Sequence, residues 1–285
     1  MKLAYYPGCS LEATAKEFDS SARAVCKALD IELAEIPEWT CCGATSAHAT
    51  NHNLSVGLPA LTIKQLQQMG LDCVVPCSAC FNRLKTAEYN MINNTAFRQE
   101  MEQLLSFKFD GQPRVYDLLA YIVEKIGLPA ISQKVQKPLK NLKIACYYGC
   151  LSVRPQAITG IDSVENPMQL DNLVKTLGAT PVAWSYKVEC CGAGHSVAKS
   201  SMVTDLSGRI LAKARAAGAN AVVNACPLCQ TNLEMRRPPG EDLPVLFFTE
   251  LMGLAFGLPE TRHWWSKHLV DPSKLADSVQ AGATS

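Results

Sequence analysis

Short apolar segments alternate with longer helical ones in both halves of this chain, in the order strand, helix, strand, helix, strand, helix. A polar, alanine-rich helix is expected after the first strand, up to about Leu29, and an extra helix over 91–110. The expected strands cover residues 2–8, 31–37 and 72–76 in the first half, and 142–149, 180–189 and 220–225 in the second. Strands that alternate with helices predict parallel, Rossmann-like α/β sheets.

The two halves also match each other in sequence, which indicates an internal duplication. KLAYYPGCS in the first half matches KIACYYGCL in the second, and the tripeptide CCG occurs at 41–43 and again at 190–192. The halves end alike, in RVYDLLAYIVEKIGLP and PVLFFTELMGLAFGLP. We expect two domains related by a pseudo-twofold axis, at 1–130 and 143–270, joined by a polar linker at 131–142. The small polar residues 271–285 are expected to form a loosely ordered or partner-docking tail.

Size, charge and composition narrow the class of protein. With 285 residues, of which 48% are hydrophobic, the chain is long enough for two domains with sizeable cores. It has no apolar run of membrane-spanning length, and MKLAYYPGCS lacks the apolar stretch of a secretory signal, so we expect no membrane insertion. A net charge of +1 argues against nucleic acid as a partner. The 13 cysteines cannot all pair as disulfides, which favours the reducing cytoplasm.

Ten of the 13 cysteines form a five-cysteine pattern that occurs twice. Each copy has a single cysteine, a Cys-Cys pair and a C-x-x-C motif, with 34 residues between pair and motif in both copies. The gap before the pair is 31 residues in one copy and 39 in the other. The cysteines are Cys9, Cys41, Cys42, Cys77 and Cys80, then Cys150, Cys190, Cys191, Cys226 and Cys229. Because each group follows an expected strand, we expect the groups of each half to converge at one sheet edge.

Two equivalent sites for soft metals are the first interpretation of this pattern. Five thiolates per copy is one more than a tetrahedral zinc ion or an ordinary four-iron cubane uses, so a polynuclear iron–sulfur site fits better. Structural zinc with one spare cysteine per half stays open, as does a set of buried thiols that only fill a core. Neighbouring cysteines that recur after the same interval have a rationale in metal binding and none in packing.

The other candidate residues are fewer and their signals are weaker. His48 and His52 have the i, i+4 spacing of a helical metal clasp, but with no acidic partner nearby we interpret them as a polar helix face. His195 follows the second CCG motif and is a candidate proton donor. Three cysteines are interpreted as core residues: Cys26, Cys73 and Cys146. Three glycines are expected to approach a cluster or to take positive φ: Gly43, Gly192 and Gly194.

With these motifs, the chain resembles the cysteine-rich CCG domains found in the B subunit of heterodisulfide reductase. The likeness covers nearly the whole chain and includes the YYPGC opening and the ending FFTELMGLAFGL. Related CCG proteins include the iron–sulfur subunits of glycolate oxidase and of anaerobic glycerol-3-phosphate dehydrogenase, which usually carry an additional ferredoxin module. This chain has no C-x2-C-x2-C-x3-C-P run, so ferredoxin-type electron transfer would require another protein.

The resemblance implies two noncubane 4Fe–4S clusters, each bound by one five-cysteine set. In that family a disulfide lies between the clusters and is cleaved by reduction. Its electrons come from the flavin-containing A subunit through the ferredoxin-like C subunit. One site could instead hold a cubane 4Fe–4S cluster or zinc. Proximity in sequence to the second-half cysteines makes five residues candidates for the substrate cleft: Tyr147, Tyr148, Arg154, Lys187 and His195.

The resulting hypothesis is a cytoplasmic disulfide oxidoreductase, the catalytic subunit of a heterodisulfide reductase-type complex. Its substrate would be the heterodisulfide of coenzyme M and coenzyme B, CoM-S-S-CoB, or an analogous small-molecule disulfide. The alternative is a non-catalytic iron–sulfur electron-transfer subunit of a lactate- or glycolate-type dehydrogenase.

Overall fold

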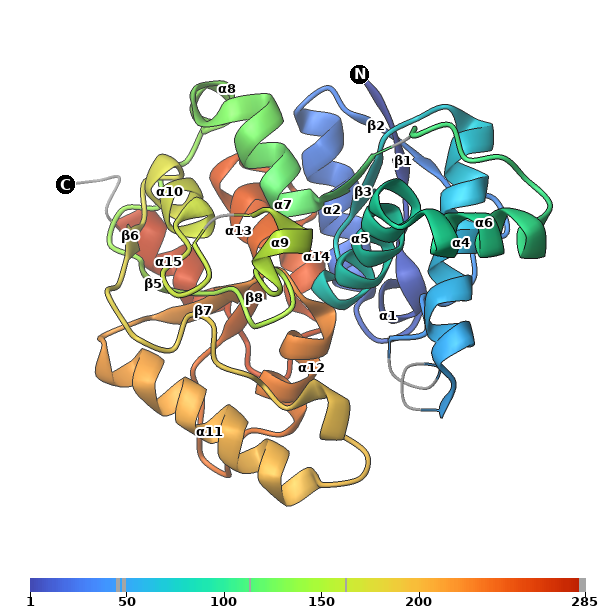
Figure 1. Ribbon diagram of the computed structural model, residues 1–285. Coiled ribbons are helices and arrows are strands. Elements are labelled where there is room, and N and C mark those ends of the chain that lie inside the picture. The colour runs from blue at the N-terminus through green and yellow to red at the C-terminus, as the bar shows by residue number, and fades with distance from the viewer. Residues whose placement is uncertain (45–46, 48–49, 113, 162, 282–285) are drawn as a thin grey trace.

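Two four-stranded parallel sheets, one in each half of the chain, form the framework of the protein (Figure 1). The computed structural model describes residues 1–44, 47, 50–112, 114–161 and 163–281. The strand orders are β2-β1-β3-β4 and β6-β5-β7-β8, and every pair is parallel. The strands are β1 (Lys2–Tyr5), β2 (Glu32–Glu35), β3 (Cys73–Val75), β4 (Val115–Asp117), β5 (Lys143–Tyr147), β6 (Thr180–Pro181), β7 (Ala221–Asn224) and β8 (Val245–Phe247). The predicted duplicated α/β fold class is confirmed.

Helices cover the sheets and connect their strands. The helices of the first half are α1 (Gly8–Ala13), α2 (Lys16–Ala28), α4 (His52–Met69), α5 (Ser78–Asn93), α6 (Thr95–Leu105), α7 (Leu118–Tyr121), the π-helix η1 (Ile122–Gly127) and α8 (Leu128–Lys134). Those of the second are α9 (Gln156–Thr159), α10 (Gln169–Thr176), the 3-10 helix η2 (Ala193–His195), α11 (Ser200–Ala216), α12 (Pro227–Met235), α13 (Phe248–Ala255), α14 (Thr261–Trp265) and α15 (Ser273–Ala281). Helix α2 illustrates why such segments form helices that pack on the core, because Phe18, Ala22 and Val25 recur at helical spacing and are fully buried.

The structure differs from the sequence-based expectations at five segments. Strands β4 and β8, each three residues long, were not expected. The strand expected over 180–189 is reduced to the two residues of β6. Residues 131–134, assigned to the linker, complete helix α8. Most of the polar tail forms helix α15, in which Leu275 and Ala276 are buried against the core, because these two side chains supply an apolar face.

The two halves share one hydrophobic core. Helix α2 of the first half packs against α13 and α14 of the second, and α10 of the second packs against α7 and α8 of the first (Figure 1). Phe18 stacks on Phe247, with ring centroids 4.0 Å apart and planes at 7°. Beside them, the hydroxyls of Ser21 and Thr249 lie 2.6 Å apart. This reciprocal packing holds the two sheets in a fixed relation to each other.

Candidate metal centre

The ten patterned cysteines lie beyond the carboxyl ends of strands or at the first turns of helices. Cys9 lies in the first turn of α1, which directly follows β1. Cys77 is the residue before α5, and Cys80 lies in the first turn of that helix. In the second half Cys226 and Cys229 occupy the equivalent places on α12. Helix N-termini carry partial positive charge and unpaired amides, and such positions attract negatively charged groups.

In the first half, Cys42 links the thiols of the Cys-Cys pair and the C-x-x-C motif. Its Sγ lies 3.3 Å from Sγ of Cys80, and the thiol of Cys41 forms a hydrogen bond with it. The hydrogen bonds from Cys41 and Cys80 lower the pKa of Cys42 to about 3. The thiol of Cys77 in turn forms a hydrogen bond with Cys80, and the charge of Cys9 acts on Cys41. The five thiols of the first copy therefore gather at one place.

The second half repeats this arrangement. Sγ of Cys191 lies 3.4 Å from Sγ of Cys229, and the thiol of Cys226 forms a hydrogen bond with Cys229. Cys150 and Cys190 are also hydrogen-bonded, and the bond from Cys150 lowers the pKa of Cys190 to about 6. Cys190 is exposed and Cys150 partly exposed, whereas the other three thiols of this set are buried. Each half thus buries part of its thiol set and leaves part at the surface.

The two thiol sets meet at the boundary between the halves. The side chains of Cys77 of the first half and Cys226 of the second interact across this boundary, and both residues are buried. The interaction with Cys226 is the main cause that raises the pKa of Cys77, and the interactions with Cys229 and then Cys77 lower the pKa of Cys226. The two expected sites are therefore neighbours.

A buried tyrosine backs each thiol set, and sequence reasoning missed the role of this pair. The hydroxyl of Tyr6 donates to the Thr40 carbonyl over 2.6 Å, and that of Tyr147 donates to the Glu189 carbonyl over 2.7 Å. Each acceptor directly precedes a Cys-Cys pair. Burial and then the nearby thiolate charges raise the pKa of both tyrosines, so both stay protonated donors. The signal was present, because both residues lie in the repeated YYPGC and CYYGC segments.

A glycine lies against the C-x-x-C motif of each half. A Cβ atom on Gly8 would lie 2.9 Å from Sγ of Cys80, and one on Gly149 would lie 3.1 Å from Sγ of Cys229. Both glycines have φ of +69°, which is a backbone conformation that other residues rarely adopt. Any side chain here would displace a cysteine of the set.

The residues present fit an iron–sulfur cluster in each half. Soft thiolates are its usual ligands, and five gather in each half. Backbone amides add hydrogen bonds to sulfur, from Gly43 to Cys41 over 3.5 Å and from Gly192 to Cys190 over 3.3 Å. These two glycines have positive φ as expected, whereas Gly194 does not. Within the described part of the chain, no three or more Cys, His, Asp or Glu side chains are arranged to hold a single metal ion.

The residues expected to line a substrate cleft differ in their exposure and in their contacts. Lys187 is buried, with Nζ 2.9 Å from Oδ1 of Asp171, and the hydroxyl of Tyr148 donates to the same carboxylate over 2.7 Å. This buried network is structural, because it occupies the polar atoms of both candidates. Arg154 is half-exposed, paired with Glu165 at 3.0 Å. His195 is exposed, and its charge lowers the pKa of Cys190 after the larger effects of Cys150, burial and the Gly192 amide.

The remaining predicted residues are not part of the thiol sets or lie outside the described residues. Cys26, Cys73 and Cys146 are fully buried, and burial raises the pKa of each, that of Cys26 to about 12. Their surroundings therefore suit neutral core thiols, as expected. His48 lies outside the described residues, and His52 begins helix α4.

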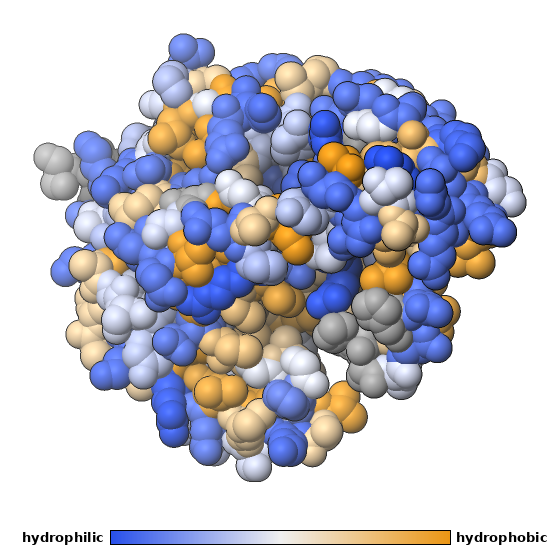
Figure 2. Space-filling model, in the orientation of Figure 1, coloured by the Kyte–Doolittle hydropathy of each residue, from blue (hydrophilic) through white to orange (hydrophobic). Residues whose placement is uncertain are grey.

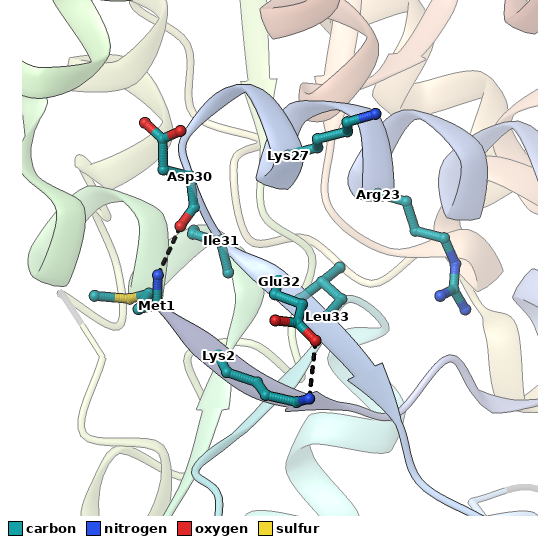
Figure 3. Close-up of a pocket in the computed structure, with 8 residues that line it drawn as sticks. All are labelled: Met1, Lys2, Arg23, Lys27, Asp30, Ile31, Glu32 and Leu33. Carbon is teal, nitrogen blue, oxygen red and sulfur yellow. Dashed lines mark hydrogen bonds and ion pairs between the residues drawn. The ribbon is translucent and has the colours of Figure 1, made fainter.

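A surface hollow of about 800 Å³ lies at the opposite end of the first sheet (Figure 3). It is lined by the starts of β1 and β2, while the cysteines follow the ends of those strands. Two polar contacts join its lining residues: the amino group of Met1 donates to the Asp30 carbonyl over 2.7 Å, and Nζ of Lys2 lies 2.8 Å from Oε1 of Glu32. Figure 2 shows hydrophilic and hydrophobic residues interspersed over the face that it presents. The thiol sets, not this hollow, define the candidate site.

Fold and thiol geometry together describe a duplicated α/β protein with a five-cysteine set at the sheet edge of each half. The model of the cysteine-rich domain family, CCG, matches this chain twice, at residues 3–85 and 144–234. The chain belongs to this family.

Curated relatives of similar length share the likeness. The chain is 33% identical to the 8-methylmenaquinol:fumarate reductase membrane anchor subunit of Wolinella succinogenes, over 96% of this chain and 99% of that protein. It is 26% identical to the B subunit of the ferredoxin/F420H2-dependent CoB-CoM heterodisulfide reductase of Methanosarcina acetivorans, over 90% and 89%. A protein of Archaeoglobus profundus that is named for its likeness to the heterodisulfide reductase B subunit is 22% identical over 97% and 93%. The predicted likeness to the B subunit of heterodisulfide reductase is confirmed.

A solved structure shows the same fold. A hypothetical protein from Helicobacter pylori superposes with a TM-score of 0.74 over 95% of this chain, at 8% identity. The chain spans about half of that protein, 52% of its length. Among the residues described in our structure, no helix combines the length and the apolar character needed to cross a bilayer.

Proposed function

We propose that this chain is the catalytic subunit of a heterodisulfide reductase-type complex, in which a small-molecule disulfide is cleaved between two noncubane 4Fe–4S clusters. Residues 1–130 would hold one cluster through Cys9, Cys41, Cys42, Cys77 and Cys80. Residues 143–270 would hold the other through Cys150, Cys190, Cys191, Cys226 and Cys229. When bound, the clusters would supply one electron each. The observation that carries the proposal is that Cys77 and Cys226, buried cysteines of different halves, interact through their side chains, which makes the two sites neighbours.

The stoichiometry of disulfide reduction suits a pair of adjacent one-electron sites. Cleavage of RS–SR′ takes two electrons and two protons and releases RSH and R′SH. A disulfide such as CoM-S-S-CoB between the sites could receive one electron from each side. His195 is our candidate for one proton, because it is exposed and lies near enough to Cys190 to influence its pKa. The protein's own part is to hold the thiol sets at a fixed spacing, through the shared core, and to limit access of water to the buried thiols.

The electrons would come from partner proteins, because this chain lacks a ferredoxin-type cysteine run. By analogy with the heterodisulfide reductase relatives, we propose two cytoplasmic partners, which are a ferredoxin-like C subunit plus a flavin-containing A subunit. The exposed thiols Cys9, Cys41 and Cys190 mark where a cluster would come nearest to the surface in each half.

Iron analysis of single cysteine variants tests the ligand assignment. Protein purified without oxygen should contain about eight irons and labile sulfide. Cys42→Ser and Cys191→Ser should each reduce iron to about half. Cys26→Ala is the matched control, since Cys26 is buried but remote from both sets, and it should keep all the iron. Zinc without iron in the native protein, or full iron in both serine variants, would contradict the five-thiolate assignment.

Reoxidation of the reduced protein by disulfides tests the catalytic role. A stopped-flow trace should show both clusters being reoxidised by CoM-S-S-CoB or another member of a panel of small disulfides. Buffer without disulfide and the corresponding free thiols are the controls. No reaction with any disulfide would leave the chain as an electron carrier only.

A second candidate function is a non-catalytic iron–sulfur electron-transfer subunit. It is favoured by the 33% identity to a fumarate reductase subunit, which is higher than that to the heterodisulfide reductase relatives. In this case the adjacent sites would pass electrons to a partner flavoprotein. Co-purification with a flavoprotein that has fumarate reductase, lactate dehydrogenase or glycolate dehydrogenase activity, together with the lack of a disulfide reaction, would support this candidate.

A further inference from the structure

One of the differences between the two halves lies on the helices that carry the C-x-x-C motifs. Helices α5 and α12 both begin after the first cysteine of a C-x-x-C motif, and the third residue after the second cysteine is Arg83 in the first half and Asn232 in the second. One turn of helix separates each of them from Cys80 or Cys229, so both project on the same side as that cysteine. A cationic and a neutral side chain therefore occupy equivalent places.

Both side chains act on the equivalent thiol of the Cys-Cys pair. Nδ2 of Asn232 lies 2.9 Å from the carbonyl oxygen of Cys191 and 3.7 Å from its Sγ. Its Oδ1 accepts from the Ser196 hydroxyl over 2.8 Å, which fixes the orientation of the amide. In the first half the positive charge of Arg83 lowers the pKa of Cys42, although less than the interactions with Cys41 and Cys80 do.

The two helices also differ in charge at a second position, which carries Lys85 in α5 and Glu234 in α12. Nζ of Lys85 lies 2.6 Å from Oε2 of Glu88, and Oε1 of Glu234 lies 3.0 Å from Nδ1 of His268. Each charge is thus paired with an opposite one, and the inference rests on the first difference.

We propose that Arg83 and Asn232 make the two sites electrostatically unequal, so that the first-half site has the higher reduction potential and takes the first electron. This proposal rests on the proposed function, since it needs a cluster in each half. Adding an electron makes a cluster more negative, and a nearby cation stabilises that state, because cluster potentials depend on local charge and on hydrogen bonds to sulfur. The amide of Asn232 supplies only a dipole. Arg83 and Asn232 are positioning residues, which act through the thiolates.

A redox titration followed by EPR spectroscopy tests the inference on the intact protein. The native protein should show two different midpoint potentials. Arg83→Asn should lower only the higher of the two midpoint potentials. It should shift the distribution of the first electron toward the second-half site by about tenfold, which corresponds to about 59 mV for a one-electron couple. Arg83→Lys retains the charge and should largely restore the native value.

Asn232→Asp provides an independent test, because Asp is close in shape to Asn and adds a negative charge. This variant should lower only the lower of the two midpoint potentials and so increase the difference between them. Equal potentials in a native protein with two clusters, or an Arg83→Asn variant with unchanged potentials, would overturn the inference and leave the proposed function standing. Fewer than two clusters in the native protein would overturn both.

Discussion

Substitution of Gly8 by alanine is a sharp test of the thiol geometry, because the chain contains a matched control. The new Cβ would lie 2.9 Å from Sγ of Cys80 and 3.3 Å from Cε1 of Tyr6. Cys80 cannot move freely, since its Sγ is 3.3 Å from Sγ of Cys42. Gly70 has nearly the same backbone conformation, with φ of +63° against +69°, but no atom lies within 4 Å of its Cβ position.

The two variants separate backbone strain from displacement of the cysteine. A left-handed conformation costs an alanine about 1–2 kcal/mol, so Gly70→Ala should lose about that much stability. Gly8→Ala carries the same cost. In addition, the overlap must move Cys80 by several tenths of an ångström, or force Tyr6 and the backbone apart. A ligand shift of this size matters, because bonds between metals and thiolates tolerate only small changes in length.

Iron and labile sulfide per chain, measured on protein purified without oxygen, are the decisive quantities. Gly70→Ala should keep the native iron content, with a lower thermal unfolding temperature. Gly8→Ala should lose about half of the iron, and Gly149→Ala, whose Cβ would lie 3.1 Å from Sγ of Cys229, should lose a similar share from the other half. Equal iron contents in Gly8→Ala and Gly70→Ala would refute the reasoning.

Two buried groups lead to predictions about pH. His268 lies between Glu234 and Glu250, whose carboxylates raise its pKa to about 10 despite burial. Its stabilisation is therefore complete below pH 6.5 and lost as pH rises through 10, so His268→Gln should lose about 3–5 kcal/mol near pH 6 and less near pH 10, by denaturant unfolding. Burial raises the pKa of Asp117 to about 7, so native stability should fall as pH rises from about 4 through 7. Asp117→Asn should flatten this dependence in thermal scans at several pH values, and an unchanged slope would contradict it.

The sequence predicted the sheets and the convergence of the cysteines because both depend on local patterns. Apolar runs alternate with amphipathic segments, and the carboxyl ends of parallel strands necessarily meet at one edge. Strands β4 and β8 escaped prediction because they are three residues long and lead directly into α7 and α13. In such short strands the alternation of buried and exposed residues cannot be distinguished from the apolar run of the helix that follows.

Long-range contacts could not be predicted from these patterns. Lys187 is close in sequence to Cys190, but its side chain points into a buried network with Asp171. Its partner is set by how α10 packs, which no local pattern records. Likewise, the burial of Leu275 in the polar tail could not be predicted, because a short helix can pack on the core through one apolar residue per turn, which is too weak a pattern to detect in the sequence.

The shared core explains how thiol sets from two halves of the chain lie next to each other. Cys77 and Cys226 come from different halves, so the interaction of their side chains requires the two sheets to keep a fixed spacing. Stacking of Phe18 on Phe247 supplies part of that constraint, and such aromatic side chains each bury about 150–250 Å². An isolated half would expose this surface and lose its stabilisation. The duplication therefore did not produce two independent modules: each thiol set is held in place by packing that the other half provides.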